Sequence, residues 1–243
     1  MAIQSQNDDG DAVVPGADLV SAVMRAVTAR IRENELMPGD RLPSEAALTK
    51  ELDVSRTVVR EALRSLAAMR IIEISAGRRA VVARLDHGPF SLLLEHGIYT
   101  EQINVRQIYD VRRTIEARTV ALAALRRSDR EAAEIVRLAE AMRASEDAVD
   151  ALMESDFAFH AAIAVASRNP VFALIVKAFQ GVIRQNWDVG WRARTTRDAR
   201  ESMFRNHYDI ALSVESGDPV EAARLMGLHF EDSARALVDA GLG

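Results

Sequence analysis

The stretch PGDRLPSEAALTKELDVSRTVVREALRSL, residues 38–66, decides the fold of the N-terminal part of the chain. It contains two amphipathic helix patterns, from Ser44 to Leu52 and from Ser55 to about Met69, each opened by a serine that can cap a helix. Only two residues separate the patterns. Two helices joined by so short a turn predict a helix-turn-helix, whose second helix can lie in the DNA major groove.

The second helix carries side chains suited to DNA recognition. Arg56, Thr57 and Arg60 lie on its first turns and face outward, next to Ser55. An arginine guanidinium can donate two hydrogen bonds at once to a phosphate or a guanine edge. Hydroxyls at a helix N-terminus can bind phosphate oxygens together with the free backbone N–H groups. The opposite face supplies the predicted core contacts: Val54, Val58, Val59, Ala62, Leu63 and Leu66.

A β-hairpin is predicted directly after this helix. Its strands are residues 71–74 and 80–83, with Gly77, Arg78 and a second arginine at the tip. A hairpin in this position is a wing, whose arginines can reach a phosphate or an adjacent groove. Residues 54–84 contain seven arginines against two glutamates, a net +5 in a chain of net charge −5. A small helical core with solvated arginines would be the alternative, but a basic patch in an acidic protein is typical of a nucleic-acid surface.

The bulk composition describes a globular protein of one large or two modest domains. The chain has 243 residues, of which 49% are hydrophobic and 28% charged. It has no cysteine, which excludes disulfides and thiolate metal sites and is compatible with a reducing compartment. No stretch is long and apolar enough to span a membrane, and the N-terminus lacks a signal-peptide pattern. We therefore expect a cytoplasmic protein with no membrane partner.

The helix caps and the glycine and proline breaks along the chain predict a mainly α fold in two domains. Residues 1–17 are interpreted as a disordered tail and residues 18–86 as the winged helix-turn-helix domain, which begins with a helix from Leu19 to Leu36. Residues 87–99, with the sequence Gly-Pro near their start, are interpreted as a linker. Residues 100–243 are expected to form a helical domain for effector binding and dimerisation.

The C-terminal domain is predicted to be an antiparallel bundle of six to seven helices. Ser128 followed by Glu131 is a capping box, and Pro219 stands at a favoured first helical position. Residues 91–104 could add one short helix. The expected helices are Val105–Arg126, Asp129–Ala144, Ala148–Ala166, Pro170–Trp187, Arg197–Glu215 and Pro219–Ala240.

Three histidines fall inside strong helical patterns of this bundle: His160, His207 and His229. Asp156 lies four residues before His160 and so shares its helix face. One carboxylate and three imidazoles converging from three helices would bind a divalent metal, with zinc the first choice and nickel, manganese or iron as alternatives. A buried histidine is more often a hydrogen-bonded core residue, and the sequence does not show that the three helices converge.

A further stretch combines aromatic and basic residues: Trp187, Trp191, Arg192, Arg194, Arg197 and Arg200. Such a stretch can contact nucleic acid, but charge runs of this kind are more often solvated. We interpret it as a solvated loop or a dimer contact.

Residues 19–84 resemble the winged helix-turn-helix of the GntR family of bacterial transcription regulators, most closely in PGDRLPSEAAL and VSRTVVREALRSL. Three positions depart from that family. Ala46 stands where arginine is common, and Arg70 and Arg79 stand where glycine is usual, which leaves the operator sequence open. The resemblance implies that the DNA-binding residues are Arg41, Ser44, Ser55, Arg56, Thr57, Arg60, Gly77 and Arg78.

The C-terminal domain resembles the FCD effector domain of the FadR subgroup of that family. DFAFH, residues 156–160, followed by ASRNP, residues 166–170, looks like its D-x-x-F-H…N-P motif, and the later histidines match its ligand positions. Asn206 departs from the glutamate usual before the first of these. The resemblance implies metal ligands at Asp156, His160, His207 and His229, and effector contacts at Arg112, Glu116 and Asn169.

These patterns predict a homodimeric, ligand-responsive transcription regulator rather than an enzyme. A small carboxylate effector, such as a hydroxy acid, sugar acid or dicarboxylate, would bind through the metal and change the affinity for double-stranded operator DNA. One alternative keeps DNA binding but uses a metal-free effector such as an acyl-CoA. A metal-dependent enzyme is the other, but no motif indicates a general base. Repression is the commoner arrangement, although the sequence leaves the sign of control, the effector and the target genes open.

Overall fold

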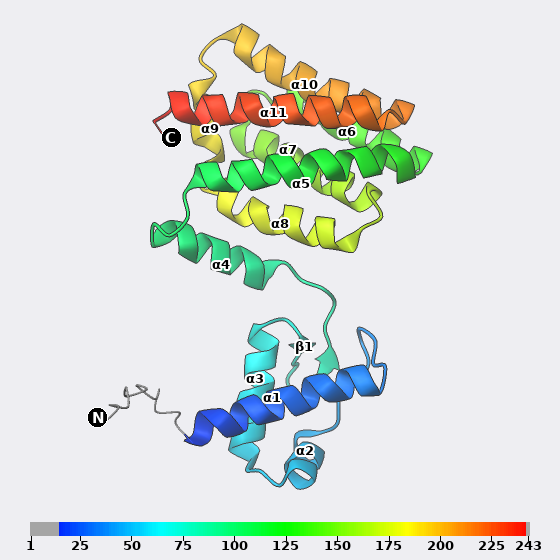
Figure 1. Cartoon of the computed structure of the whole chain (residues 1–243), viewed down its shortest axis with the longest axis vertical. Coiled ribbons are helices and arrows are strands. Elements are labelled where there is room, and N and C mark those ends of the chain that lie inside the picture. Colours follow the sequence, from blue (N-terminus) through cyan, green and yellow to red (C-terminus); the bar gives the residue numbers. More distant parts are fainter. Residues whose placement is uncertain (1–14, 242–243) are drawn as a thin grey trace, which may run out of the picture. The chain divides into compact units, whose positions relative to one another are not determined.

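The computed structural model describes residues 15–241 and confirms the predicted fold class (Figure 1). The described residues form eleven helices and one small two-stranded sheet. The chain divides into two compact units, the first ending at Asp86 and the second beginning at His87. None of the helices in the described residues combines the length and apolar character needed to cross a membrane.

The first unit is a winged helix-turn-helix. The Ser44 hydroxyl accepts a hydrogen bond from the Ala47 N–H at 3.1 Å, and the Ser55 hydroxyl accepts one from the Val58 N–H at 3.3 Å. Both predicted caps therefore start their helices. The elements are α1 (Pro15–Glu33), α2 (Glu45–Leu52), α3 (Arg56–Ala68), β1 (Ile72–Glu73) and β2 (Val81–Val82).

The N-terminal boundary differs from the prediction. Helix α1 begins at Pro15, inside the segment that was expected to be a disordered tail, because proline is well accommodated in the first turn of a helix. The rest of that expectation, residues 1–14, lies outside the described residues. The helix ends at Glu33, three residues before the predicted end.

The wing is a shorter hairpin than predicted. Its antiparallel register pairs Ile72 with Val82, and each strand has two residues instead of four. The turn closes with a 3.1 Å hydrogen bond from the Arg78 N–H to the Ser75 carbonyl, and Gly77 adopts a φ of +70° at the tip. A left-handed φ explains why glycine stands there.

The end of α3 explains the unusual Arg70. The Ile71 N–H donates to the Leu66 carbonyl and the Arg70 N–H donates to the Ala67 carbonyl, both at 3.0 Å. This pair of bonds is a Schellman motif, whose central residue is left-handed and is usually glycine. Arg70 adopts that conformation, with a φ of +57°. The chain therefore has a strained non-glycine residue at the junction between the recognition helix and the wing.

The second unit is a helical bundle whose boundaries largely follow the sequence prediction. Helix α5 packs against α11, α6 packs against α7 and α10, and α7 packs against α8. The helices are α4 (Gly88–Tyr99), α5 (Val105–Arg126), α6 (Asp129–Ala144), α7 (Val149–Ala166), α8 (Pro170–Arg184), α9 (Trp187–Ala193), α10 (Arg197–Ser216) and α11 (Pro219–Asp239).

The segment predicted as a linker, residues 87–99, is instead helix α4 packed on α8 (Figure 1). Its proline lies in the first turn, where the missing N–H costs no helical hydrogen bond. The Ser91 hydroxyl donates to the Ala178 carbonyl of α8 at 3.1 Å. A Cβ on Gly181 would lie 3.2 Å from the Ser91 Cβ, so this glycine permits the close approach of the two helices.

The aromatic and basic stretch is also different from the prediction. Instead of a solvated loop it contains helix α9, whose Trp191 is buried. The Trp187 and Trp191 rings stack with centroids 6.3 Å apart. Trp191 belongs to the domain core and Trp187 is half-buried against it, whereas Arg192 and Arg197 remain exposed.

Candidate metal centre

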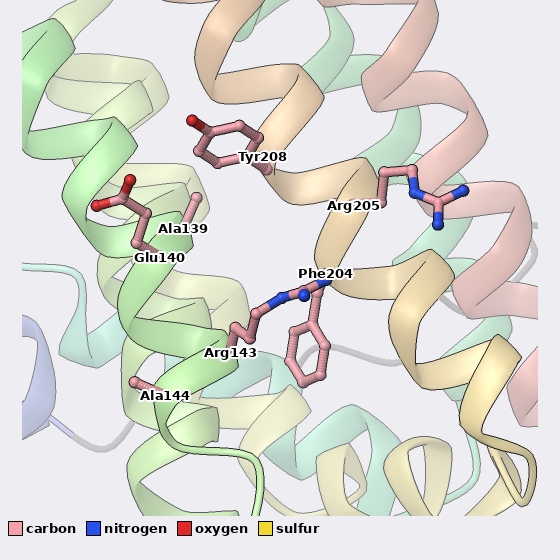
Figure 2. A pocket seen from close by; sticks show the side chains of 7 residues that line it. All are labelled: Ala139, Glu140, Arg143, Ala144, Phe204, Arg205 and Tyr208. Atoms are coloured by element: carbon pink, nitrogen blue, oxygen red, sulfur yellow. The ribbon is translucent and has the colours of Figure 1, made fainter.

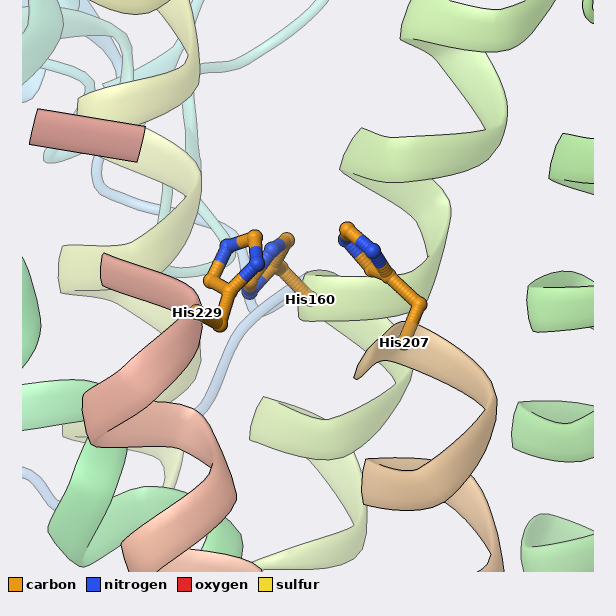
Figure 3. Close-up of side chains that lie close together, drawn as sticks. All are labelled: His160, His207 and His229. Carbon is orange, nitrogen blue, oxygen red and sulfur yellow. The ribbon is translucent and has the colours of Figure 1, made fainter. Parts of the chain in front are cut away.

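Three histidines from three helices converge inside the bundle. His160 of α7, His207 of α10 and His229 of α11 each offer a ring nitrogen within 4.8 Å of the others, and all three are buried (Figure 3). The ring centroids of His207 and His229 are 4.5 Å apart, and those of His160 and His229 are 5.1 Å apart. The convergence that the sequence left open is therefore present.

Asp156, one helical turn before His160, borders the same cluster. Its Oδ1 lies 3.0 Å from His207 Nε2 and 3.7 Å from His160 Nε2. The Trp187 indole N–H donates to the other carboxylate oxygen at 3.0 Å. Burial by itself would raise the pKa of Asp156, but the hydrogen bond with His207 and the charges of the histidines hold it well below its usual value. Asp156 thus remains an anionic side chain at the edge of the cluster.

The ring of His160 is oriented from behind by Glu116. His160 Nδ1 lies 2.5 Å from Glu116 Oε2, and a carboxylate can only accept, so the imidazole donates through Nδ1–H. In the neutral form of the ring, this assignment places the lone pair on Nε2. In the described structure His160 Nε2 is buried and has no hydrogen-bond partner.

His207 is fixed in the same way by the backbone. Its Nδ1 lies 2.9 Å from the Met203 carbonyl, and its Nε2 lies 3.0 Å from Asp156 Oδ1, so both ring nitrogens face an acceptor. His229 makes no hydrogen bond with any described residue, and desolvation together with its histidine neighbours lowers its pKa well below the usual value. The His229 imidazole is therefore neutral near physiological pH, which is the form that binds metals.

Arg112 and Glu116 form a buried ion pair behind the histidines. Arg112 Nε donates to Glu116 Oε1 at 2.7 Å. Burial alone would raise the pKa of Glu116, but the charges of Arg112 and His160 lower it below its usual value. The guanidinium also lies over the rings of Phe230 and Tyr109, 4.8 and 5.5 Å from their centroids. Glu116 was expected to contact the effector, but its carboxylate is already used by Arg112 and His160.

A small cavity of about 30 Å³ adjoins the cluster. Arg112, one of the predicted effector contacts, lines it. Asn169 does not: its side chain caps α8 by accepting from the Val171 N–H at 3.0 Å. The lining residues are Tyr109, Arg112, Asp156, Trp187, Gly190, Trp191, Arg194, Met203, His207, His229, Ser233 and Leu237.

Several cavity residues were missed by sequence reasoning. Trp187, Gly190, Trp191 and Arg194 all come from the aromatic and basic stretch, around helix α9. The pairing of two tryptophans with an arginine was visible, but nothing in the local pattern shows that this stretch folds back onto the histidines. Tyr109 lies one turn before Arg112 on α5, so the helical spacing could have indicated it.

A larger, open groove of about 550 Å³ lies between α6 and α10 (Figure 2). The Arg143 guanidinium lies over the Phe204 ring there, 5.8 Å from its centroid. The groove is lined by Ala139, Glu140, Arg143, Ala144, Phe204, Arg205 and Tyr208. None of the clustered histidines lines it, so it is separate from the histidine cluster.

The side chains predicted to bind DNA lie on the surface of the first unit. Arg56, Thr57 and Arg60 are all exposed on α3. Arg60 forms a 3.2 Å ion pair with Glu45 of α2, and both side chains remain largely exposed. Ser44 and Ser55 use their oxygens to accept the capping bonds, which leaves each hydroxyl proton free to be donated.

The wing arginines and Arg41 lie together. Arg41 pairs with Val81 in an isolated antiparallel bridge, which places it next to the hairpin. An open cleft of about 860 Å³ is lined by Gly39, Arg41, Gly77, Arg78, Arg79 and Val81. Arg79, one of the three departures from the GntR pattern, thus adds a third arginine to this basic cleft.

A winged helix-turn-helix joined to a helical domain with a buried histidine cluster is the architecture of a transcription regulator with a separate effector domain. The chain belongs to the GntR family of bacterial regulatory proteins: that family model matches residues 19–82, and the FCD domain model matches residues 107–232.

Known relatives agree with this assignment. The HTH-type transcriptional regulator LutR of Bacillus subtilis is 30% identical over 206 residues, covering 82% of this chain and 92% of the relative. The galactonate operon transcriptional repressor of Escherichia coli is 28% identical over 202 residues, covering 81% and 87%. Both are named as transcription regulators, which confirms the predicted class of a transcription regulator.

A solved structure supports the fold. Streptococcus agalactiae GntR aligns with a TM-score of 0.62 at 24% sequence identity, covering 89% of this chain and 99% of that chain. At this identity the likeness concerns the fold alone.

Proposed function

We propose that the chain is a metal-dependent transcription regulator that binds a small organic acid. Its helical domain would control the affinity of the winged helix-turn-helix for operator DNA. The observation that carries the proposal is the buried Nε2 of His160, which has no hydrogen-bond partner although its ring is held in place by Glu116. A buried polar atom without a partner is costly unless a ligand meets it. A cation at the histidine cluster would supply that partner.

The donor set fits a divalent metal ion. His160, His207, His229 and Asp156 would hold it, with zinc the first choice for three imidazoles and one carboxylate, and nickel, manganese or iron as alternatives. Glu116 would act as the carboxylate that orients the ligating His160, a common arrangement behind metal-bound histidines. When bound, the metal would attract carboxylate and hydroxyl oxygens of an organic acid.

Arg112 supports the choice of an acid as effector. It lines the cavity beside His207 and His229, and only its Nε is bonded to Glu116. Its remaining N–H groups can be donated to a carboxylate. One relative is named as the repressor of a galactonate operon, and galactonate is an organic acid with one carboxylate and several hydroxyl groups. By the same relationship, we expect repression that the acid relieves.

Packed helices connect this cavity with the first helix of the bundle. Helix α4, which directly follows the DNA-binding unit in the sequence, packs on α8, and α8 packs on α7, which carries Asp156 and His160. The Gln180 side chain of α8 donates to the Phe157 carbonyl of α7 at 2.7 Å. An acid that prefers one arrangement of these helices would shift the population of DNA-binding states.

The DNA-binding half of the proposal uses the exposed face of α3 and the basic cleft of the wing. Arg56, Thr57 and Arg60 would contact bases and phosphates, with Ser55 donating its hydroxyl proton to a phosphate. Ser44, Arg41, Gly77 and Arg78 would bind the flanking backbone. A homodimer would present two α3 helices to half-sites about one helical turn, or roughly 34–36 Å, apart.

The test combines operator binding with control of the metal. An operator is selected from random DNA with the full-length protein, and its affinity is then measured with a panel of organic acids on zinc-loaded and chelator-stripped protein. We expect one acid to change the affinity of the zinc-loaded protein only. His229→Gln should abolish this response while leaving operator binding intact, because the His229 ring holds no hydrogen bond in the described structure.

A response that survived metal removal would contradict the metal-anchored site and favour a metal-free effector. A matched control is His96→Gln, which changes an exposed histidine of the same domain. It should leave both metal content and response unchanged.

A further inference from the structure

Arg194 is a second cationic side chain in the cavity. It follows α9 directly and its side chain is 9% exposed. One terminal nitrogen donates to the Gly190 carbonyl at 2.8 Å and the other to Asp232 Oδ2 at 2.9 Å. Its Nε is buried and has no hydrogen-bond partner in the described structure. Arg194 therefore lines the cavity as a buried guanidinium whose donors are only partly used.

Donors outnumber free acceptors in this cavity. Besides the two arginines, two residues with a hydroxyl group, Tyr109 and Ser233, belong to its lining. Asp156 is the one carboxylate among the lining residues, and its oxygens already face His207 and Trp187. A ligand rich in anionic oxygens would satisfy such a lining.

The charge balance indicates how many negative charges the ligand carries. The Arg112 and Glu116 charges cancel within their ion pair. A divalent cation and Arg194 would then face Asp156 and Asp232. The Asp232 side chain is 45% exposed and can turn to water, so the cavity would keep two uncompensated positive charges. Because burying unpaired charge is costly, a dianion matches this balance better than a monoanion.

We propose that Arg194 is the second anion-binding arm of the effector site and that the effector is a dicarboxylic acid. One carboxylate lies at the metal and Arg112, and the other replaces Asp232 as the partner of Arg194. This inference rests on the proposed metal-anchored function and names the class of acid that the site selects.

Helix α9 is the wall that makes room for such a ligand. A cavity of about 30 Å³ holds a water or an ion, whereas small-molecule sites span roughly 300–1,000 Å³. Helix α9 has seven residues and no side-chain N-cap bond, and the Arg194–Asp232 pair ties its end to α11. Exchange of Asp232 for a ligand carboxylate removes that tie, so the wall moves as the second carboxylate binds.

The test compares malate with lactate, which shares the 2-hydroxy acid group but lacks the second carboxylate. Affinities are measured by calorimetric titration into the zinc-loaded full-length protein. We expect malate to bind on the order of 30-fold more tightly than lactate, since a charge-assisted hydrogen bond in a buried site carries an effect of this size. Arg194→Gln should remove the malate preference and leave lactate binding unchanged.

Two further variants distinguish loss of the second anion-binding arm from a folding defect. Asp232→Asn frees Arg194 from its competing carboxylate, so malate should bind several-fold more tightly while lactate is unaffected. Arg192→Gln makes the same substitution on α9 at a side chain that is 76% exposed and forms an ion pair with Asp188. It should behave as the wild type with both acids.

The outcomes separate this inference from the proposed function. If galactonate or lactate binds the zinc-loaded protein as tightly as malate, and Arg194→Gln alters none of these affinities, the dicarboxylate inference is wrong and the metal-anchored sensor stands. If none of the three acids binds the zinc-loaded protein, while an effector binds the stripped protein, both fail. A malate preference that is lost in Arg194→Gln and increased in Asp232→Asn supports the inference.

Discussion

In the DNA-binding unit, the side chains proposed to contact DNA lie on the surface and mostly come from one short stretch. In the bundle, the side chains proposed to bind the metal are buried and come from three helices far apart in the sequence. Arg60 pairs with an exposed glutamate, whereas Arg112 pairs with a buried one. The first ion pair can be broken at little cost in stability, whereas the second is part of the packed core.

This difference teaches that the two halves of one regulator should respond differently to substitution. Changes on the exposed face of α3 should alter DNA affinity and little else. Changes around the histidines should alter metal affinity through neighbours that never touch the metal. Four variants, ordered from the largest expected effect to the smallest, test this contrast.

The double variant Arg56→Ala and Arg60→Ala should show the largest effect, a loss of affinity for operator DNA. Each lost base or phosphate contact costs about 1–3 kcal/mol, so operator affinity should fall on the order of 100- to 1,000-fold. Fluorescence anisotropy with labelled operator at constant ionic strength measures the change. The melting temperature and zinc content should not move, because both side chains are exposed.

Arg113→Ala is the matched control for this variant. Arg113 is an exposed arginine of the bundle, paired with Glu231 at 2.5 Å. Its loss should leave operator affinity at the wild-type value. Equal loss of affinity in the control and the double variant would mean that overall charge, and not the α3 face, binds DNA.

Glu116→Gln should weaken zinc binding by about 10- to 100-fold, since carboxylates that orient ligating histidines have effects of this size. The amide keeps the shape of Glu116 but removes the charge that faces His160 and Arg112. Competition with a chromophoric chelator measures the zinc affinity. Glu221→Gln, at an exposed carboxylate of α11, serves as the control. Unchanged zinc affinity in Glu116→Gln would show that His160 needs no orienting partner.

Arg70→Gly should stabilise the first unit by about 1 kcal/mol, because glycine adopts the left-handed conformation without steric cost. Native-state hydrogen exchange of the α3 amides in the full-length protein measures this stability. The same substitution at Arg64, inside the helix, should have the opposite sign and destabilise by about 1 kcal/mol. Destabilisation by both variants would argue against strain at Arg70.

Glu131→Gln should produce the smallest effect. The Ser128 backbone N–H and the charge of Arg168 lower the pKa of Glu131 below its usual value. Since its folded-state pKa is depressed, the carboxylate stabilises the bundle at neutral pH, and this contribution is lost as the pH falls through the folded-state pKa. We expect a loss of less than about 1 kcal/mol at neutral pH, because glutamine still completes the capping box.

Urea unfolding followed by tryptophan fluorescence reports this loss, since both tryptophans belong to the bundle. The stabilities of the variant and the wild type should become equal at low pH. Glu140→Gln, at an exposed carboxylate of the same helix, is the comparison. If the difference in unfolding free energy between the variant and the wild type grew on acidification, the lowered pKa of Glu131 would be contradicted.

Much of the fold was predictable because its signals are local. Ser44, Ser55 and Ser128 each accept the capping bond that the sequence predicted. The linker prediction was wrong because Gly88 and Pro89 are compatible with a loop or with a helix start. Contact of Ser91 with α8, which no local pattern reports, decides between the two.

The candidate site shows the same division. Asp156 and His160 share a helix face by their spacing, so their proximity followed from the sequence. Glu116 was assigned to the effector, yet its contacts with His160 and Arg112 place it behind the histidine. The charged stretch around Arg194 predicted a solvated loop or a dimer contact, although the fold buries Arg194 itself.

By itself the sequence determined most helix boundaries of the bundle, the winged helix-turn-helix and the identity of the histidines, because caps and periodicity act over a few residues. Only the tertiary structure decided that three helices bring their imidazoles within 4.8 Å, that His160 Nε2 is left without a partner, and that α9 closes over the cavity. These features depend on packing between segments distant in the chain. Burial, which no local pattern encodes, then sets the charge state and the hydrogen-bond partners of each group.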